Sequence, residues 1–219
     1  MRKYVFIHIG KCGGNYVRSR IQFNSPSVHY VHGYKPPIHD SFVYLSLIRN
    51  PLIRLISAFN QSKTVQLWSA EKFHAKTFNC LNFVAEHLYH SDSSPNRVMY
   101  EALACRFHVM QSLHFYLAPL IDQIPAQNFL GFLVLDRIEQ DILELVQKHP
   151  SDIRVVGHST AAKPERPDQS SSAYLDLSDL ALANLSKYLE SEYQLVMRLF
   201  EEGYLNRAQY LALSRYSAL

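Results

Sequence analysis

The sequence predicts an α/β fold in which a central, mainly parallel sheet is flanked by helices. Short apolar segments of strand length alternate with segments of helical apolar spacing along the 219 residues, as expected of successive βα units. Hydrophobic residues make up 47% of the chain, which is enough for the core of one sizeable domain. No repeat or linker divides the sequence, so we expect residues 1–219 to form a single domain.

The first part of the chain contains three expected strands, at residues 3–9, 27–34 and 41–50. A segment with helical spacing, residues 15–23, follows the first strand directly. The third strand ends at Pro51, and the missing N–H of proline suits the first turn of a helix. We therefore expect a helix at residues 51–61.

The rest of the chain continues the alternation. Helical spacing covers two segments that are separated by a turn-forming cluster, residues 69–88 and 96–117. A strand, a helix and a short final strand are expected at residues 128–135, 136–149 and 151–156. A Ser- and Pro-rich loop at 157–174 precedes one long amphipathic helix at 177–203 and a short last helix.

Composition excludes several classes of partner and site. The formal net charge of +3 is too small to indicate a nucleic-acid partner, although it suits a groove for a small anionic ligand. The three cysteines are odd in number and widely spaced, so they predict neither disulfides nor a zinc site. No segment has the roughly 20 apolar residues of a membrane span. We expect a cytoplasmic protein without metal or membrane insertion; composition leaves its oligomeric state open.

The first motif is the glycine-rich turn "GKCGG" between the first strand and the first helix. Gly10, Gly13 and Gly14 permit backbone angles at which several N–H groups point toward one anion, and Lys11 adds a full positive charge. The lysine precedes the glycine pair, whereas the triphosphate loop GxxxxGK[ST] places it after the glycines. The alternative is an ordinary turn with Lys11 in solvent.

The second motif is "LIRNPLIRLISAF", in which Arg49 follows the third strand. Ligands of open α/β sheets bind at the carboxyl ends of the strands. Arg54 and Ser57 are three residues apart and share a helix face, and an arginine with a hydroxyl suits a phosphate. The alternative for Arg54 is a solvated position on a surface helix.

Together the two motifs resemble the cofactor-binding motifs of sulfotransferases, which use 3′-phosphoadenosine 5′-phosphosulfate (PAPS). "FIHIGKCGG" is similar to their 5′-phosphosulfate loop, and "LIRNPLIRLISAF" to their 3′-phosphate site, with Arg49 and Ser57 in the binding positions. Weaker similarities follow in the same order, at residues 135–146, 158–168 and 187–199. The resemblance implies a P-loop-like three-layer fold.

The resemblance also implies the roles of individual residues. The PAPS-binding residues would be Gly10, Lys11, Cys12, Gly13, Gly14, Asn15, Arg49, Ser57 and Lys163. Lys11 would stabilise the leaving 5′-phosphate, and Lys163 would contact PAPS from the Ser- and Pro-rich loop. The alternative for Lys163 is a solvated lysine of that loop. The chain departs from the family at Gly10, Asn15 and Asp136, where proline, threonine or serine, and glutamate are common. Cys12 replaces a frequent threonine, and we expect it to pack in the loop although a nucleophilic role is the alternative.

A histidine is the expected general base that takes the proton of the acceptor hydroxyl. The candidates in "VHYVHGYKPPIH" are His29, His32 and His39. His32 precedes Gly33 at a strand end, and "VHGY" partly resembles the catalytic histidine segment of the uronyl 2-O-sulfotransferases. We therefore expect His32 to be the base, with His29 as the second choice. In a strand the two would face opposite sides.

The predicted function is therefore transfer of a sulfuryl group from PAPS to a hydroxyl of an acceptor. The acceptor would be a small molecule or a glycan; the preference for a carbohydrate rests on the family resemblance. His29 and His108 are candidate acceptor-binding residues, although His108 with Gln111 and His114 would also suit the polar side of a helix. The alternatives are a P-loop-like small-molecule kinase, disfavoured by the missing GK[ST], and a non-catalytic phosphoadenosine-binding module.

Overall fold

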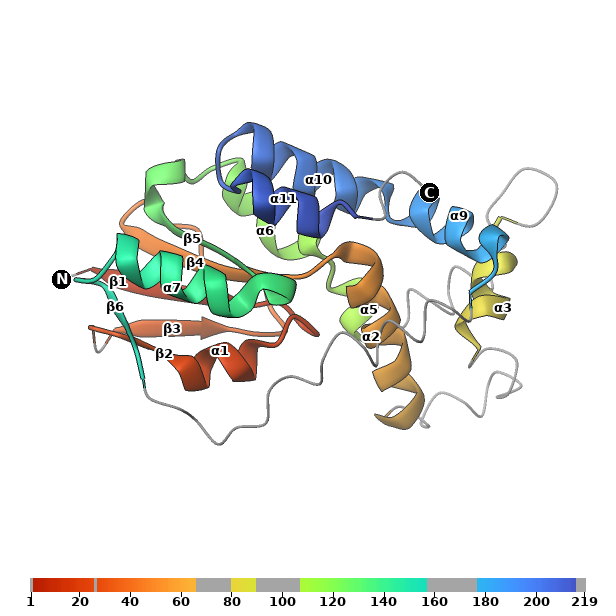
Figure 1. Ribbon diagram of the computed structural model, residues 1–219, viewed down its shortest axis with the longest axis horizontal. Helices are drawn as coiled ribbons and strands as arrows, with labels where there is room; N and C mark the ends of the chain where they lie inside the picture. The colour runs from red at the N-terminus through yellow and green to blue at the C-terminus, as the bar shows by residue number, and fades with distance from the viewer. Residues whose placement is uncertain (1, 26, 66–79, 90–106, 157–176, 216–219) are drawn as a thin grey trace.

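The computed structural model describes residues 2–25, 27–65, 80–89, 107–156 and 177–215, and it confirms an α/β fold with a central parallel sheet (Figure 1). The sheet has the strand order β3-β1-β4-β5, and each neighbouring pair is parallel. The strands are β1 (Lys3–His8), β3 (Val28–Val31), β4 (Phe42–Ile48) and β5 (Phe129–Val134).

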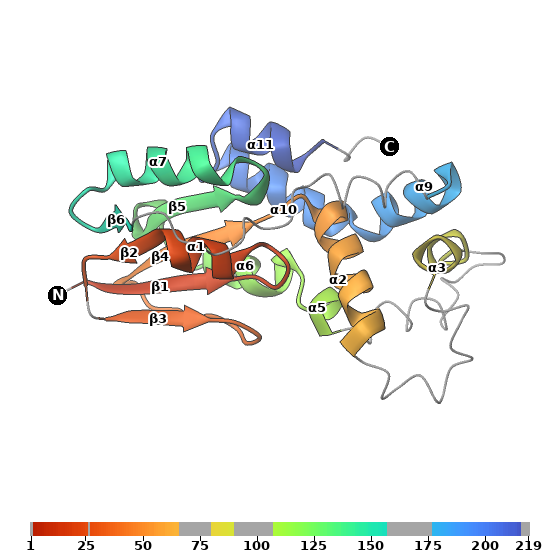
Figure 2. The same cartoon turned by 60° about the horizontal axis from the view of Figure 1, so that its bottom comes forward.

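Helices cover both faces of this sheet. The first helix, α1 (Gly14–Arg20), and α7 (Ile138–Lys148) lie on one face, whereas α6 (Leu113–Ile121) and α10 (Glu190–Glu201) lie on the other (Figures 1 and 2). The chain moves from β1 outward to β3 in one direction and from β4 to β5 in the other. Right-handed crossovers in opposite directions place their helices on opposite faces, which explains the three layers.

The sheet register brings three chain segments to one edge. His8 at the end of β1 is paired with Leu47 of β4, and Ile48 of β4 is paired with Val134 of β5. The residues that follow these strands, including Lys11 and Arg49, therefore emerge together at the carboxyl ends of the strands. Ligands of open parallel sheets bind at this edge.

The expected helix at residues 15–23 is too long by three residues. Helix α1 ends at Arg20, and Ile21–Phe23 form a short strand, β2, that pairs antiparallel with β6 (Ile153–Val155). Ile21 and Phe23 are buried whereas Gln22 is exposed, which is the alternation of a strand with one buried face. The tertiary partner thus overrides the local helical pattern.

Helix α2 (Pro51–Val65) begins at Pro51, as expected, and it extends beyond residue 61. The side chain of Asn50 caps it, because Oδ1 accepts hydrogen bonds from the N–H groups of Leu52 and Ile53 at 3.1 and 3.2 Å. Asn50 Nδ2 also donates to the Leu213 carbonyl at 2.7 Å. The strand-to-helix junction after Arg49 is therefore fixed from both sides.

Two expected long helices are interrupted. The segment 177–203 is divided at Leu189 into α9 (Asp179–Tyr188) and α10. The described part of 96–117 contains α5 (Phe107–Met110) and the start of α6, with Ser112 as the N-cap that accepts from Phe115 N–H. The described residues also contain α3 (Leu81–Glu86) and α11 (Arg207–Leu213). No helix in the described ranges is long and apolar enough to cross a membrane.

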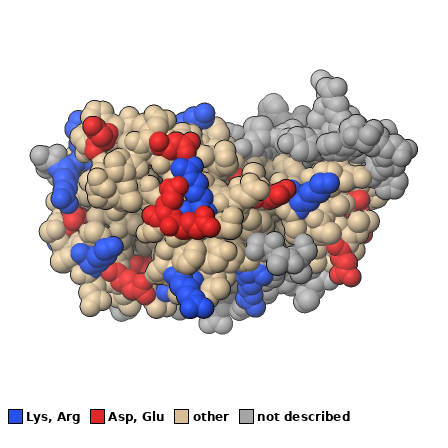
Figure 3. Space-filling view, turned by 90° about the horizontal axis from the view of Figure 1, so that it is seen from above, with Lys and Arg blue, Asp and Glu red and all other residues tan. Residues whose placement is uncertain are grey.

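The surface over α10 and α11 carries charges of both signs that lie next to one another (Figure 3). Arg198 of α10 forms ion pairs with Asp122 and Glu202, at 2.5 and 2.6 Å. Paired surface charges of this kind create little net field. The described part of this face therefore shows no extended surface of one sign.

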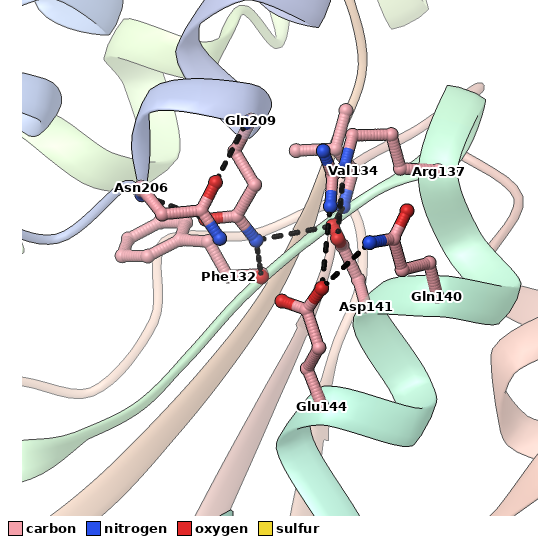
Figure 4. Close-up of polar contacts among 8 residues, drawn as sticks. All are labelled: Phe132, Val134, Arg137, Gln140, Asp141, Glu144, Asn206 and Gln209. Carbon is pink, nitrogen blue, oxygen red and sulfur yellow. Dashed lines mark hydrogen bonds and ion pairs between the residues drawn. The ribbon is translucent and has the colours of Figure 1, made fainter.

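Asp141 of α7 fixes the carboxyl end of β5 (Figure 4). Its carboxylate is buried and accepts hydrogen bonds from Val134 N–H, Gln209 Nε2 and Arg137 Nε, at 2.8, 3.0 and 3.1 Å. Gln209 also donates to the Phe132 carbonyl at 2.7 Å, which joins α11 to the same strand. The pKa of Asp141 is raised, because the effect of burial exceeds the opposite effect of the three donors. The strand end that leads to Asp136 is thus held rigidly.

Candidate functional site

The loop between β1 and α1 makes a tight left-handed turn. Lys11 has a φ of 69° and Gly13 a φ of 83°, and Cys12 N–H donates to the Ile9 carbonyl at 3.2 Å. Positive φ is uncommon for a residue with a side chain, and such backbone strain often occurs at functional sites. The turn projects Lys11 from the carboxyl end of β1.

The glycines of this loop are required mainly by close packing. A Cβ at Gly13 would lie 2.6 Å from Leu135 Cδ1, and the φ of 83° also disfavours any other residue. A Cβ at Gly14 would lie 2.1 Å from Cδ2 of His8, although Gly14 is an ordinary helical residue. The expectation that glycine angles shape the loop holds for Gly13, whereas Gly14 is needed because an imidazole occupies its side-chain space.

Gly10 has the same kind of role toward His108. A Cβ at Gly10 would lie 2.4 Å from His108 Nδ1, so only glycine lets this ring approach the loop so closely. The approach places His108 beside the turn of residues 10–14, although it comes from α5, far away in the sequence. Gly10, which stands where the sulfotransferases that the sequence resembles commonly have proline, thus makes room for a histidine.

Cys12 shapes the loop from the inside. Its side chain is fully buried, and burial raises the pKa of the thiol to about 12. Its N–H is already used by the Ile9 carbonyl within the turn. A thiol that keeps its proton is a poor nucleophile, so the expected packing role is supported and the nucleophilic alternative is not.

Two cations, Lys11 and Arg49, meet at this loop. Arg49 is only 7% exposed, and one of its terminal nitrogens lies 3.5 Å from the Lys11 carbonyl oxygen. The pKa of Lys11 is lowered, first because it is partly buried and then because the charge of Arg49 repels its ammonium. Two like charges that lie close together in a partly buried place disfavour each other's charged form.

Asp136 contributes a negative charge to the same region. It lies in the turn after β5, within electrostatic range of Arg49 and of Arg215 near the end of the chain. Desolvation raises the pKa of Asp136, while the charges of Arg49 and Arg215 lower it. Sequence reasoning did not single out Arg215, because nothing in its local sequence marks it.

Arg54 is not a solvated residue, so that alternative is wrong. It is 3% exposed, and its guanidinium donates to the backbone carbonyls of His108, at 2.8 Å, and of Gln111. Its donors therefore hold the chain between α5 and α6. Ser57, on the same helix, is half-buried, and its expected contact with the 3′-phosphate stays a prediction.

Three histidines, His8, His32 and His108, gather beside Lys11; we call them the histidine cluster. The rings of His8 and His32 stack with their centroids 4.5 Å apart, and those of His32 and His108 are 5.8 Å apart. Burial, followed by the charges of His32 and Arg18, lowers the pKa of His8 to about 4. Burial and the nearby His32 and Lys11 also lower the pKa of His108. Both rings are thus kept neutral at pH 7.

The hydrogen bond of His32 determines which ring nitrogen is available. Its Nδ1 lies 3.0 Å from the backbone carbonyl oxygen of His8. A carbonyl only accepts, so Nδ1 carries the proton and the neutral ring has its lone pair on Nε2. His32 is exposed, and the structure places it just beyond the end of β3, as expected.

The other candidate residues lie apart from the cluster or outside the described residues. His29 is exposed on β3, with its Nε2 3.3 Å from the Tyr34 hydroxyl. His39 contacts Ser41 and Asp40 instead. Asn15 is exposed in the first turn of α1. Lys163 and its loop lie outside the described residues.

His8 is a residue that sequence reasoning missed. It interrupts the apolar run of β1, and a polar residue in a buried strand can indicate a functional site. The residue was instead counted as part of the expected strand. Among the described residues, no group of His, Cys, Asp or Glu side chains is arranged to hold a metal ion. Comparison of the chain with family models, curated proteins and solved structures found no match.

Proposed function

We propose that the protein is a sulfotransferase that moves a sulfuryl group from PAPS to a hydroxyl group, with a carbohydrate as the expected acceptor. One observation carries the proposal: Lys11 and Arg49 are held together at the carboxyl ends of adjacent parallel strands, with three imidazole rings beside them. The cations suit the 5′-phosphosulfate and the 3′-phosphate of PAPS, respectively. PAPS would supply the sulfuryl group and a stable phosphate leaving group.

The roles of the residues follow from their charges. Lys11, in its strained turn, would place its ammonium against the oxygen that joins sulfur to the 5′-phosphate. Charge develops on this oxygen as the sulfur–oxygen bond breaks, and a positioned cation is then most effective. Arg49, nearly buried and pinned at the start of α2, would anchor the 3′-phosphate by charged hydrogen bonds.

His32 is suited to act as the general base. The acceptor hydroxyl would give its proton to His32 Nε2 while its oxygen bonds to sulfur. In the neutral ring, the hydrogen bond from Nδ1 to the His8 carbonyl leaves the lone pair on Nε2, and the same bond supports the imidazolium formed during the reaction. A positioned base of this kind contributes about 10²–10⁴-fold to rate.

The distribution of charge along the chain favours an anionic donor. Residues 1–70 contain nine Lys and Arg residues but one acidic residue, Asp40, although the whole chain has a net charge of only +3. This segment forms β1, β3, β4 and the loop that holds Lys11. A local excess of positive charge raises the concentration of an anion at the site and its rate of association.

A binding and transfer experiment tests the proposal. The bisphosphate product, adenosine 3′,5′-bisphosphate, should raise the melting temperature, whereas ATP at the same concentration should not. Label from radiolabelled PAPS should move to one of a panel of glycan and small-molecule hydroxyl acceptors. Stabilisation by ATP alone would favour a small-molecule kinase, and bisphosphate binding without transfer would favour a non-catalytic binding module.

Two variants with a matched control test the individual cations. Lys11→Ala should abolish most transfer while largely sparing bisphosphate binding. Arg49→Ala should weaken that binding by about 1.5–3 kcal/mol, the value of a charged hydrogen bond. Lys3→Ala removes an exposed lysine from the other end of β1 and should change neither quantity. Wild-type transfer by Lys11→Ala, or wild-type binding by Arg49→Ala, would remove that residue from its role.

A further inference from the structure

The peptide after His32 is held on both sides by buried side chains. Gly33, with a φ of 83°, donates its N–H to the Tyr116 hydroxyl at 3.0 Å. Its carbonyl accepts from Gln111 Nε2 at 2.6 Å. Both partners come from the chain around α6, about 80 residues away in the sequence. An exposed turn therefore has its main-chain groups bonded to the interior.

The two side chains also bond to each other. The Tyr116 hydroxyl donates to Gln111 Oε1 at 3.0 Å, which closes a ring of three hydrogen bonds with Gly33. Tyr116 is fully buried and Gln111 is 7% exposed. Each donor in the ring meets an acceptor, so neither the amide of Gln111 nor the hydroxyl of Tyr116 can reverse without losing a bond.

Arg54 ties this ring to the helix that follows Arg49. Its guanidinium donates to the carbonyl of Gln111 and, at 2.8 Å, to that of His108. The same buried arginine therefore fixes the residue that holds Gly33 and the residue whose ring faces His32. These bonds give the segment between α5 and α6 a single arrangement relative to α2.

We propose that Gln111 and Tyr116 are positioning residues that hold His32 with Nε2 toward the acceptor. His32 is exposed, and its own side chain is held by the His8 carbonyl and by stacking on the His8 ring. Without the ring at Gly33, the turn after β3 could rotate and His32 Nδ1 would lose the His8 carbonyl. This inference rests on the proposed function, because it gives His32 the role of general base.

Tyr116→Phe tests the inference, and Tyr44→Phe is a matched control. Tyr44 is also fully buried, and its hydroxyl also accepts from a loop N–H, that of His39, at 2.9 Å and donates to the Pro37 carbonyl. Both variants lose one buried hydroxyl and should lose similar stability. Only Tyr116→Phe should lower kcat, by about 10–100-fold, because a misplaced general base loses part of its contribution to the rate. The affinity of this variant for the bisphosphate should stay within about twofold of the wild type.

A second readout does not depend on activity. The ¹⁵N shifts of the His32 ring should show the Nδ1–H form in the wild type and in Tyr44→Phe, and a mixture of both tautomers in Tyr116→Phe. An unchanged tautomer and unchanged kcat in Tyr116→Phe would overturn the positioning role. If the wild type transfers no label to any acceptor, the proposed function fails, while the tautomer comparison still decides whether Gln111 and Tyr116 position His32.

Discussion

Substitution of Gly14 by alanine tests the packing of the loop between β1 and α1 against the histidine cluster. The added Cβ would lie 2.1 Å from Cδ2 and 2.3 Å from Cγ of His8, so the ring or the helix must move. The His8 ring is stacked on His32 at 4.5 Å and cannot swing away without breaking that contact. Overpacking of this kind costs about 1–3 kcal/mol.

The higher helix propensity of alanine opposes this loss of stability. Alanine is favoured over glycine in a helix by up to about 1 kcal/mol, and Gly14 has an ordinary helical conformation. The difference predicts that Gly14→Ala lowers the free energy of unfolding by up to about 2 kcal/mol. In a His8→Ala background the clash is absent, so the same substitution should be neutral or stabilising.

Urea unfolding of the wild type, both single variants and the double variant measures this coupling. Gly203→Ala is the control, because Gly203 has a φ of 79° and no atom within 4 Å of an added Cβ. This variant should lose about 1–2 kcal/mol of unfolding free energy through its backbone angle alone, with or without His8. If Gly14→Ala is as destabilising in the His8→Ala background as in the wild type, the clash with the His8 ring is not the cause of the loss.

The remaining predictions concern ionisation and buried polar groups. Because the pKa of His8 is lowered to about 4 in the folded protein, the unfolded chain binds its proton first, and the stability that neutral His8 provides above pH 6.5 is lost as the pH falls toward 4. Between pH 7 and pH 4.5, the free energy of unfolding in urea should fall by about 2 kcal/mol more for the wild type than for His8→Phe, allowing for partial exposure of the ring. Equal decreases in the two proteins would contradict the lowered pKa of His8. Ser46 Oγ is buried and has no hydrogen-bond partner among the residues that the structure describes, so Ser46→Ala should raise the free energy of unfolding by about 1 kcal/mol. A lower free energy of unfolding in urea would show that the hydroxyl has a partner. Iodoacetamide at pH 8 should label exposed Cys80 but not Cys12, whose pKa is raised to about 12; peptide mass mapping that finds Cys12 labelled in the native protein would contradict its burial.

The sequence allowed the layers of the fold to be predicted, because apolar runs and helix boundaries are local features. Strands β1, β4 and β5 follow from buried runs, and the start of α2 follows from Pro51. The pairing of β2 with β6 could not be predicted, since Phe23 and Ile153 are far apart in the sequence and each strand has only three residues. The break at Leu189 was also hidden, because the apolar spacing continues across it.

The candidate site shows the same division. The positions of Lys11 and Arg49 at strand ends follow from the sequence order, and the structure brings them together. The histidine cluster depends on His8 and His108, whose rings meet the loop only because Gly14 and Gly10 lack side chains. The partners of Arg54 are backbone carbonyls, which no pattern of residue types reveals.

The contact between Gly10 and His108 has a consequence for sequence variation among related proteins. Any residue other than glycine at position 10 would drive a Cβ into the imidazole ring, at 2.4 Å from Nδ1. Proline, which is common at this place in the family that the chain resembles, would do the same. We therefore expect the residues at positions 10 and 108 to change as a pair, with a histidine at 108 only where 10 is glycine. Positions 14 and 8 should covary in the same way. The glycines of the loop would then predict whether a related sequence has a histidine at positions 108 and 8.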